Sequence, residues 1–418
     1  MKKGIMFMAV FLLASSAFTV KADEVAELKV QMKQMQERLE QMEAAQKAQE
    51  QSVDAKISKA VEAKEVNVPD SLKWAEKVKI SGDLRYRHES IDSSNDAGWE
   101  SRHRIRARLG LDAKINDEWD ARFQIASGSA DPVSTNQTLD ESFSSKTIWL
   151  DLAYFTWHPE AASGLNIYGG KMVNPFYVVG GNQLMWDGDL NPEGVAASYL
   201  IPLGENDELT ITGGGLWVNE NSTADSTVDT SLWGLQGSLK HKFEDKSYLL
   251  GGVSYFDYGN IQGTGNLKQT WSTSSSFFGN TSSGGAFVND YDILELFSEY
   301  GFKVGEMPVA VFGDYVTNTV ATTSEDTGWL IGCKFNKAKN PGSWELSYDY
   351  RDLEADAVVG ALSDSDFIGG GTDGKGHRFG FKYQIAKNLQ GGLAYFLDEF
   401  GSNNTDYNRL QADLMLKF

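Results

Sequence analysis

Four arginines alternate with other residues in one short segment, "SRHRIRARLGLDAKI", which spans residues 101–115. From residue 105 onward, the positions of the other parity are all apolar. Because side chains alternate between the two faces of a strand, this segment predicts a strand with an apolar face and a row of guanidinium groups. Three settings fit: a nucleic-acid-binding strand, a solvated edge of a soluble sheet, or the wall of a membrane barrel with a water-filled lumen.

The charge balance argues against a general nucleic-acid binder. The chain of 418 residues has 38 basic and 58 acidic residues, a net charge of -20, whereas nucleic-acid binding needs a basic surface. Cys333 is the only cysteine, so an intramolecular disulfide is impossible. None of the five histidines has metal-ligand spacing to another His or Cys, and we predict no cofactor, metal or nucleic-acid partner.

The N-terminal residues predict export, followed by a helical segment. Residues 1–22 have two lysines near the start, then a short apolar run and small residues before an acidic stretch, which is typical of a signal peptide. In residues 23–68, apolar residues from Val25 to Met42 recur at spacings of three and four, as in a coiled coil. A lone amphipathic helix is the alternative. We expect this segment in the periplasm.

From about Lys77 the hydrophobic period changes to two and stays so to Phe418. The alternating runs predict sixteen strands, and short polar turns alternate with long loops between them. Beyond the signal, no stretch approaches 18 consecutive apolar residues, so any membrane span is a strand. The prediction for residues 77–418 is therefore an all-β transmembrane antiparallel barrel. The strands are expected at 77–90, 99–115, 118–127, 145–157, 164–172, 193–201, 208–218, 230–243, 246–259, 290–304, 307–317, 327–336, 342–352, 374–386, 388–399 and 406–418.

The chain resembles bacterial outer-membrane porins, and among them the "putative porin" family with a coiled-coil segment before the barrel. The resemblance rests on "SGDLRYRHE", the arginine row, "WLDLAYFTWHP", "GGKMVNPFYVVGGNQLMWDGDLNPEGVAASY" and the terminal "RLQADLMLKF". It implies an outer-membrane location, recognition of the last strand by the barrel-assembly machinery, contact with membrane lipid, and a homotrimer.

Strand parity then selects candidate pore-lining residues. The opposite register would place the arginines in lipid, at a cost of about 2 to 4 kcal/mol each near the midplane. A sixteen-stranded barrel is also wide enough to leave an aqueous channel instead of a side-chain core. A solvated outer edge stays the alternative. The predicted pore-lining residues are Arg85, Arg87, Arg102, Arg104, Arg106, Arg108, Arg378, Lys382 and Arg409, with acidic Glu295, Glu299, Glu345 and Asp349 on the far wall.

Neighbouring guanidinium groups repel, so the row needs water or anionic partners. The third long connection carries Asp187, Asp189 and Glu193, and in general porins this loop folds into the lumen. We therefore expect Arg104 and Arg106 to face Asp187 and Asp189 across a constriction. An ordinary external loop is the alternative reading of this segment.

The preferred function is a porin through which small hydrophilic solutes and ions diffuse passively, without enzymatic activity. A structural or adhesive outer-membrane protein tethered by its coiled coil is the second hypothesis, and an outer-membrane hydrolase is the third. Steady open-channel currents in a planar bilayer separate the first hypothesis from the other two.

Deleting residues 23–66 tests the predicted coiled coil. Its apolar seam needs a partner helix, so we expect the deletion to reduce the oligomer observed in native electrophoresis. An unchanged oligomer would mean that barrel contacts alone hold the subunits together.

Overall fold

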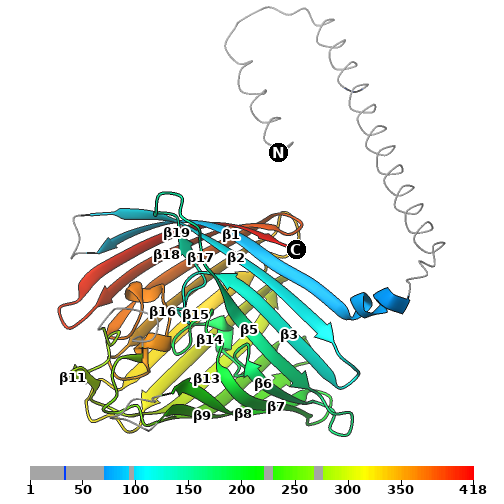
Figure 1. The fold of residues 1–418 in the computed structure, drawn as a ribbon, viewed down its shortest axis with the longest axis horizontal. Coiled ribbons are helices and arrows are strands. Elements are labelled where there is room, and N and C mark those ends of the chain that lie inside the picture. The colour runs from blue at the N-terminus through cyan, green and yellow to red at the C-terminus, as the bar shows by residue number, and fades with distance from the viewer. Residues whose placement is uncertain (1–32, 34–69, 94–97, 221–228, 268–275) are drawn as a thin grey trace, which may run out of the picture. The chain divides into compact units, whose positions relative to one another are not determined.

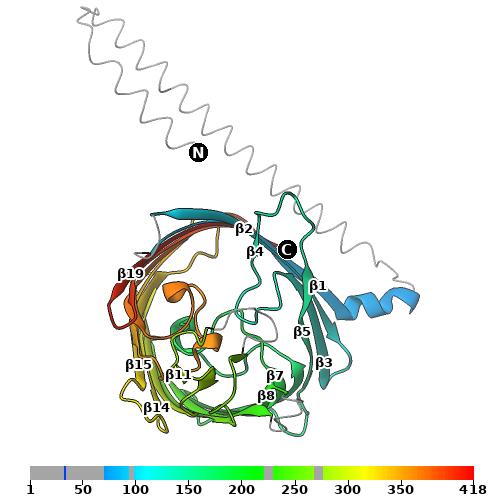
Figure 2. The ribbon, with the colours of Figure 1, turned by 60° about the vertical axis from the view of Figure 1, so that its left-hand side comes forward.

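The strands form one antiparallel sheet that closes on itself, because the first strand, β1 (Val78–Ser93), pairs with the last, β19 (Thr405–Lys417). The computed structural model describes residues 33, 70–93, 98–220, 229–267 and 276–418. Figures 1 and 2 show the resulting barrel from two sides, with loops inside its wall. Apart from Lys33, the predicted signal peptide and coiled coil lie outside the described residues.

Sixteen long strands build the wall: the sheet has 17 strands, one of which is the two-residue β4 (Gln137–Thr138). A small hairpin of β11 (Ser282–Ser283) and β12 (Ala286–Phe287) stands apart from this sheet. The long strands after β1 are β2 (Glu100–Lys114), β3 (Trp119–Ser127), β5 (Ile148–Trp157), β6 (Leu165–Lys171), β7 (Glu193–Pro202), β8 (Asp207–Asn219), β9 (Thr230–Lys242), β10 (Tyr248–Gly259), β13 (Tyr291–Val304), β14 (Met307–Asn318), β15 (Thr327–Asn336), β16 (Trp344–Leu353), β17 (Gly374–Ala386), β18 (Leu389–Phe400) and β19.

The predicted barrel is confirmed, since each predicted strand coincides with one long strand of the wall. The described helices are short 3-10 turns, η1 (Asp70–Lys77), η2 (Val179–Gly181), η4 (Gly360–Leu362) and η5 (Phe367–Gly369). Within the described ranges, no helix is long and apolar enough to cross a membrane.

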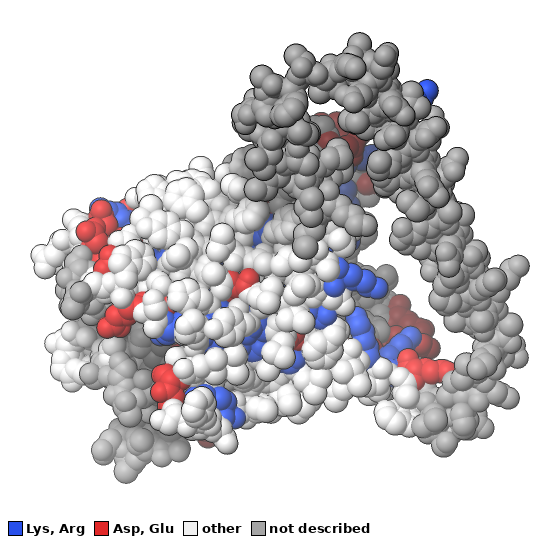
Figure 3. Space-filling view, turned by 90° about the horizontal axis from the view of Figure 1, so that it is seen from above, with Lys and Arg blue, Asp and Glu red and all other residues white. Residues whose placement is uncertain are grey.

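Alternation of side chains separates an apolar outside from a polar inside. On β2, Leu109 and Leu111 are 41% and 37% exposed, whereas Arg106 is 6% exposed. The face in Figure 3 is covered mainly by uncharged side chains. Closing the sheet gives every strand two hydrogen-bonded neighbours, so no backbone polar groups are left unpaired at an edge. The alternation of side chains places apolar groups on the outer face, and both features suit a lipid environment.

Long connections alternate with short turns along the wall. We number the long ones in chain order and use three of them below: loop 2 (residues 128–147), loop 3 (residues 172–192) and loop 7 (residues 354–373). Short turns, such as residues 305–306 and 387–388, lie between the long connections.

The chain end seals the barrel at a glycine. Phe418 and Gly82 exchange two backbone hydrogen bonds of 3.0 Å. A Cβ at Gly82 would lie 2.4 Å from the carbonyl oxygen of Arg108 and 2.5 Å from the Phe418 ring. Only glycine allows the last ring to cover the seam here.

Removing Phe418 should therefore lower the yield of assembled barrel several-fold, while barrels that do form keep their normal properties. Gly82→Ala should have a similar effect, because the new methyl group collides with the seam. The matched control is Gly237→Ala on β9, where a Cβ meets open space. Heat-modifiable mobility in electrophoresis measures the folded fraction, and equal yields for the two glycine variants would contradict this account.

Candidate functional site: the arginine wall and loop 3

Arginines of β1 and β2 lie opposite one another on the inner face of the barrel. In the β1–β2 register Arg85 is paired with Arg106, and Arg87 with Arg104. Directly opposed residues of antiparallel strands have Cα atoms about 4.5 to 5.5 Å apart, so these like charges repel. With Arg409 of β19, seven such residues form what we call the arginine wall: Arg85, Arg87, Arg102, Arg104, Arg106, Arg108 and Arg409.

Three carboxylates on the same strands offset part of this charge. Glu89 is fully buried and accepts hydrogen bonds from Arg409 Nε at 2.9 Å and Nη2 at 2.6 Å, and it also pairs with Arg102. Asp83 accepts from Arg106 and Arg108 at 2.9 and 2.7 Å. Asp413 accepts two hydrogen bonds from Arg87, at 2.7 and 2.8 Å.

Sequence reasoning did not single out these three carboxylates. Asp83 and Glu89 share the parity of Arg85 and Arg87 on β1, which is the signal that places them on the inner face. Their arginine partners come from two other strands, β2 and β19, however, and the pairing of β1 with both strands was needed to find them.

Loop 3 supplies a fourth carboxylate from the opposite side. Asp189 Oδ1 lies 3.7 Å from Nη1 of both Arg106 and Arg108. Thr135 of loop 2 holds this carboxylate by donating from its backbone N–H at 3.2 Å and its hydroxyl at 3.0 Å. Asp189 therefore faces the arginine wall, but opposite Arg106 and Arg108 instead of the predicted Arg104 and Arg106.

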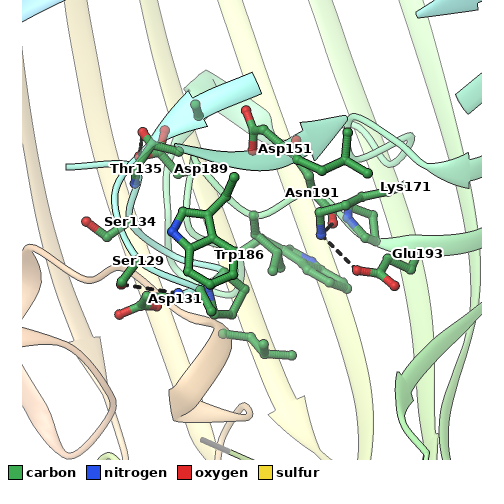
Figure 4. A pocket seen from close by; sticks show the side chains of 18 of the residues that line it. Ser129, Asp131, Ser134, Thr135, Asp151, Lys171, Trp186, Asp189, Asn191 and Glu193 are labelled. Carbon is green, nitrogen blue, oxygen red and sulfur yellow. Dashed lines mark hydrogen bonds and ion pairs between the residues drawn. The ribbon is translucent and has the colours of Figure 1, made fainter. Parts of the chain in front are cut away.

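The other two acidic residues named for loop 3 lie elsewhere. Asp187 is buried against loop 7, where its carboxylate accepts the N–H of Ser365 at 2.8 Å. Its burial, with Asp364 and Asp189 nearby, raises the pKa of Asp187 well above the usual value. Glu193 begins β7 and pairs with Lys171 at 2.9 Å, at the side of loop 3 (Figure 4). Neither opposes an arginine of the wall, because the loop turns between residues 187 and 193.

Of the predicted far-wall acids, Glu299 anchors loop 3 instead of being a solvated lumen residue, and Asp314, which sequence reasoning did not single out, does the same. Glu299 accepts the backbone N–H of Gly180 at 2.9 Å, and Asp314 accepts from the Asn182 side chain at 2.8 Å. Gln236 of β9 adds a bond to the backbone N–H of Tyr177 at 2.7 Å. Loop 3 thus spans the barrel from the acidic strands β13 and β14 to the arginine wall.

Much of the interior between loop 3 and β9–β16 is filled by apolar side chains, which differs from the aqueous lumen expected for the whole barrel. Trp186 is 4% exposed and packs on Phe256 with ring centroids 5.4 Å apart, while Phe176 meets the same ring edge-on at 4.9 Å. Loop 7 adds Val358 and Phe367 to this cluster. The sequence feature that indicates this filling is the presence of apolar residues, such as Ile293 and Phe297, at inward positions of β13. A wall that faced only water would not need apolar residues at these positions.

Cavities remain along the arginine wall. A central cavity of about 680 Å³ lies between loop 3 and Arg85, Arg87, Arg106 and Arg108, and Arg378 and Lys382 also line it. An outer cavity of about 250 Å³ follows toward the long loops, lined by Arg102, Arg104 and Arg409. Ser365 of loop 7 lines both. All nine basic residues predicted to line the pore thus border one of two cavities on the same side of the barrel.

A side cavity of about 530 Å³ lies behind loop 3 (Figure 4). It is lined by Trp186 and Asp189 of loop 3 together with Asp151 of β5 and Ser134 of loop 2. Asn191 closes one edge by donating to Asp151 at 2.8 Å. Loop 3 consequently separates this cavity from the arginine wall.

Two carboxylates of loop 7, those of Asp364 and Asp366, form ion pairs with arginines. Asp364 pairs with Arg351 at 2.8 Å, and Asp366 lies 3.0 Å from Arg409 and 3.3 Å from Arg87. Across the described ranges, no group of three or more His, Cys, Asp or Glu residues is arranged to hold a metal ion. The chemistry of this site is charge and hydrogen bonding by fixed side chains.

Gly180 allows the close contact between loop 3 and the barrel wall. Its φ is 59°, and a Cβ there would lie 2.5 Å from the Phe312 ring. Gly181 has nearly the same φ, 56°, but its Cβ would meet only Lys334 Nζ at 3.8 Å.

Gly180→Ala should therefore release loop 3 from β13 and β14, whereas Gly181→Ala, which carries the same backbone strain, should release it much less. Limited proteolysis with mass spectrometry measures cleavage within residues 172–192. Equal cleavage of the two variants would show that the contact with Phe312 does not hold the loop.

Comparison with known proteins places this arrangement in a family. The family model described as "Putative porin" matches residues 93–293 and 293–418. No curated protein is a significant match. Among solved structures, the chain is similar to OprB of Pseudomonas putida, with a TM-score of 0.54, 10% identity, and coverage of 84% of this chain and 96% of that one.

It is also similar to OmpF of Salmonella typhi, with a TM-score of 0.50, 11% identity, and coverage of 82% of this chain and 97% of that one. At these identities the likeness shows the barrel fold alone. The family match covers most of the chain, and its residues include the arginine row of β2, loop 3 and the terminal strand. The protein therefore belongs to the putative porin family.

Proposed function

We propose that the protein forms a water-filled channel in the bacterial outer membrane for passive diffusion of small hydrophilic solutes and ions, and that the path runs between the arginine wall and loop 3. The observation that carries this proposal is the pair of cavities along one wall, both lined by guanidinium groups, of which the central one is also lined by Asp189 of loop 3. Porin family membership and the barrel fold support a channel instead of an enzyme.

Opposed fixed charges give this path its selectivity. Arg106 and Arg108 on the wall face Asp189 on loop 3, so a transverse field crosses the cavity. Filtration by such a site depends on cavity size and on the charges that line it, with no bond made or broken.

The assembly proposed for the channel is a homotrimer, inserted by the barrel-assembly machinery through its last strand, with residues 23–68 in the periplasm. The support is the apolar seam from Val25 to Met42 and the terminal Phe418 in the sequence.

Charge replacement tests the path in a planar bilayer. Removing Arg106 and Arg108 together by alanine should shift the reversal potential in a salt gradient toward cations, and Asp189→Asn should shift it toward anions. At about 7 Å, one charge changes the free energy of a passing ion by about 0.6 to 2.4 kcal/mol at effective dielectric constants of 80 to 20, so several-fold changes in permeability ratio are expected.

The control removes two lysines away from the arginine wall, Lys246 in a short turn and Lys303 at the end of β13, and should leave the reversal potential unchanged. If the arginine variant inserts normally and matches the wild type in both reversal potential and conductance, these arginines do not line the path.

A further inference from the structure

The positive charge of the arginine wall exceeds the negative charge of the carboxylates that pair with it. In the ion pairs of the described residues, its seven arginines share five carboxylates: Asp83, Glu89, Asp189, Asp366 and Asp413. The difference, seven minus five, leaves two positive charges. Buried like charges on adjacent strands destabilise the fold unless anions or water offset them. The position of the excess charge therefore indicates where an anion would bind.

The excess concentrates at Arg85 and Arg104. Arg85 is 3.9 Å from Asp413, which already accepts two short hydrogen bonds from Arg87. Arg104 is 3.7 Å from Glu89, whose oxygens already accept from Arg409 and Gln411 and pair with Arg102. The side chains of Arg85 and Arg104 are only 9% and 13% exposed.

Both residues have donors left over. The buried Nε atoms of Arg85 and Arg104 have no hydrogen-bond partner. Their other contacts are to neutral groups of loop 2: Arg85 Nη2 donates to Asn136 Oδ1 at 2.5 Å, and Arg104 Nη2 to Ser134 Oγ at 3.4 Å. Neutral acceptors satisfy hydrogen bonds but do not neutralise the guanidinium charges. Arg85 and Arg104 can therefore gain from an anionic acceptor.

These two arginines also stand at the junction of the two cavities. Arg85 and Asn136 line the central cavity, Arg104 and Ser134 line the outer one, and Ser365 borders both. An anion that moves along the wall therefore meets Arg104 and then Arg85, or the reverse, beneath loop 2.

We propose that Arg85 and Arg104, with Asn136 and Ser134, form a binding site for small oxyanions, meaning carboxylates, phosphate or sulfate, within the diffusion path. A guanidinium presents a planar fork of N–H donors that matches two oxygens of such an anion, whereas chloride is a single sphere and uses less of the fork. Asp187, Asp189, Asp366 and Asp413 also line the central cavity. Their repulsion keeps binding weak enough for release, as conduction requires.

This site deepens the proposed function, and binding can be measured separately from transport. The full chain in detergent is titrated calorimetrically with sodium sulfate, sodium phosphate and sodium succinate at constant ionic strength, with sodium chloride as the reference. In bilayers, the same anions are added to a chloride current. We expect saturable binding of oxyanions, weaker binding of chloride, and saturable inhibition of the chloride current.

Three variants localise the effect. Arg85→Gln and Arg104→Gln keep much of the side-chain length and remove the charge, and each should weaken oxyanion binding about tenfold or more, the worth of a charge-assisted hydrogen bond. Lys382→Gln removes a charge from the same central cavity, but Lys382 pairs with Glu345 at 2.8 Å and lies away from loop 2, so its effect should be much smaller.

The outcomes separate the two proposals. Oxyanion binding that depends on Arg85 and Arg104 in a protein without conductance would support this site and overturn the channel. An open channel whose wild-type form binds sulfate, phosphate and succinate no better than chloride would overturn this site and leave the channel standing. Equal loss in all three variants would also overturn it, because the effect would then be one of general charge.

Discussion

Repulsion among arginines on two paired strands is the constraint around which the interior is arranged. Arg85 faces Arg106 and Arg87 faces Arg104 across β1 and β2, inside a wall whose other face is apolar. The arginines cannot turn outward without entering lipid, so neutralisation has to come from the lumen side. Glu89 and Asp83 on β1 and Asp413 on β19 provide part of it, and Asp189 and Asp366 bring two loops to the wall.

Loop 3 is held on two opposite sides of the barrel. One end meets Arg106 and Arg108 through Asp189, and its middle is hydrogen bonded to Glu299 and Asp314 on the far strands. Apolar side chains, with Phe176 and Trp186 among them, fill the interior on the far side of the loop. The barrel is therefore divided: an apolar cluster supports the loop, and the cavities lined by arginine lie on the other side. The path that we propose for solutes is therefore narrow and off-centre.

The inward or outward direction of the strand side chains was predictable from the sequence, because the outer face must be apolar and the inner face can be polar at alternate residues. The segment 101–115 shows this directly, since its arginines and its apolar residues took the faces that alternation predicts. Strand positions followed for the same reason, including the short β6 and the closing strand that ends at Phe418. Residues before 70, with the signal and coiled-coil predictions, lie outside the described part apart from Lys33.

Partners across the lumen were not predictable in the same way. Asp187 and Asp189 are two residues apart in an irregular loop, where no period says which one turns toward the arginines. Glu89 gains its role from Arg409, which is 320 positions away in the chain. Glu299 was predicted as a solvated wall residue, and Asp314 was not singled out, because the loop that covers them comes from a different part of the sequence.

Cysteine accessibility measures the position of the path most directly. In a background with Cys333→Ser, Met415→Cys on β19 borders the central cavity, whereas Ser254→Cys on β10 lies behind loop 3, where Ser254 is 1% exposed. A bulky thiol reagent added to single channels should block current through the Met415→Cys protein and leave the Ser254→Cys protein unaffected. Block of the second without block of the first would place the path on the other side of loop 3 and contradict the account.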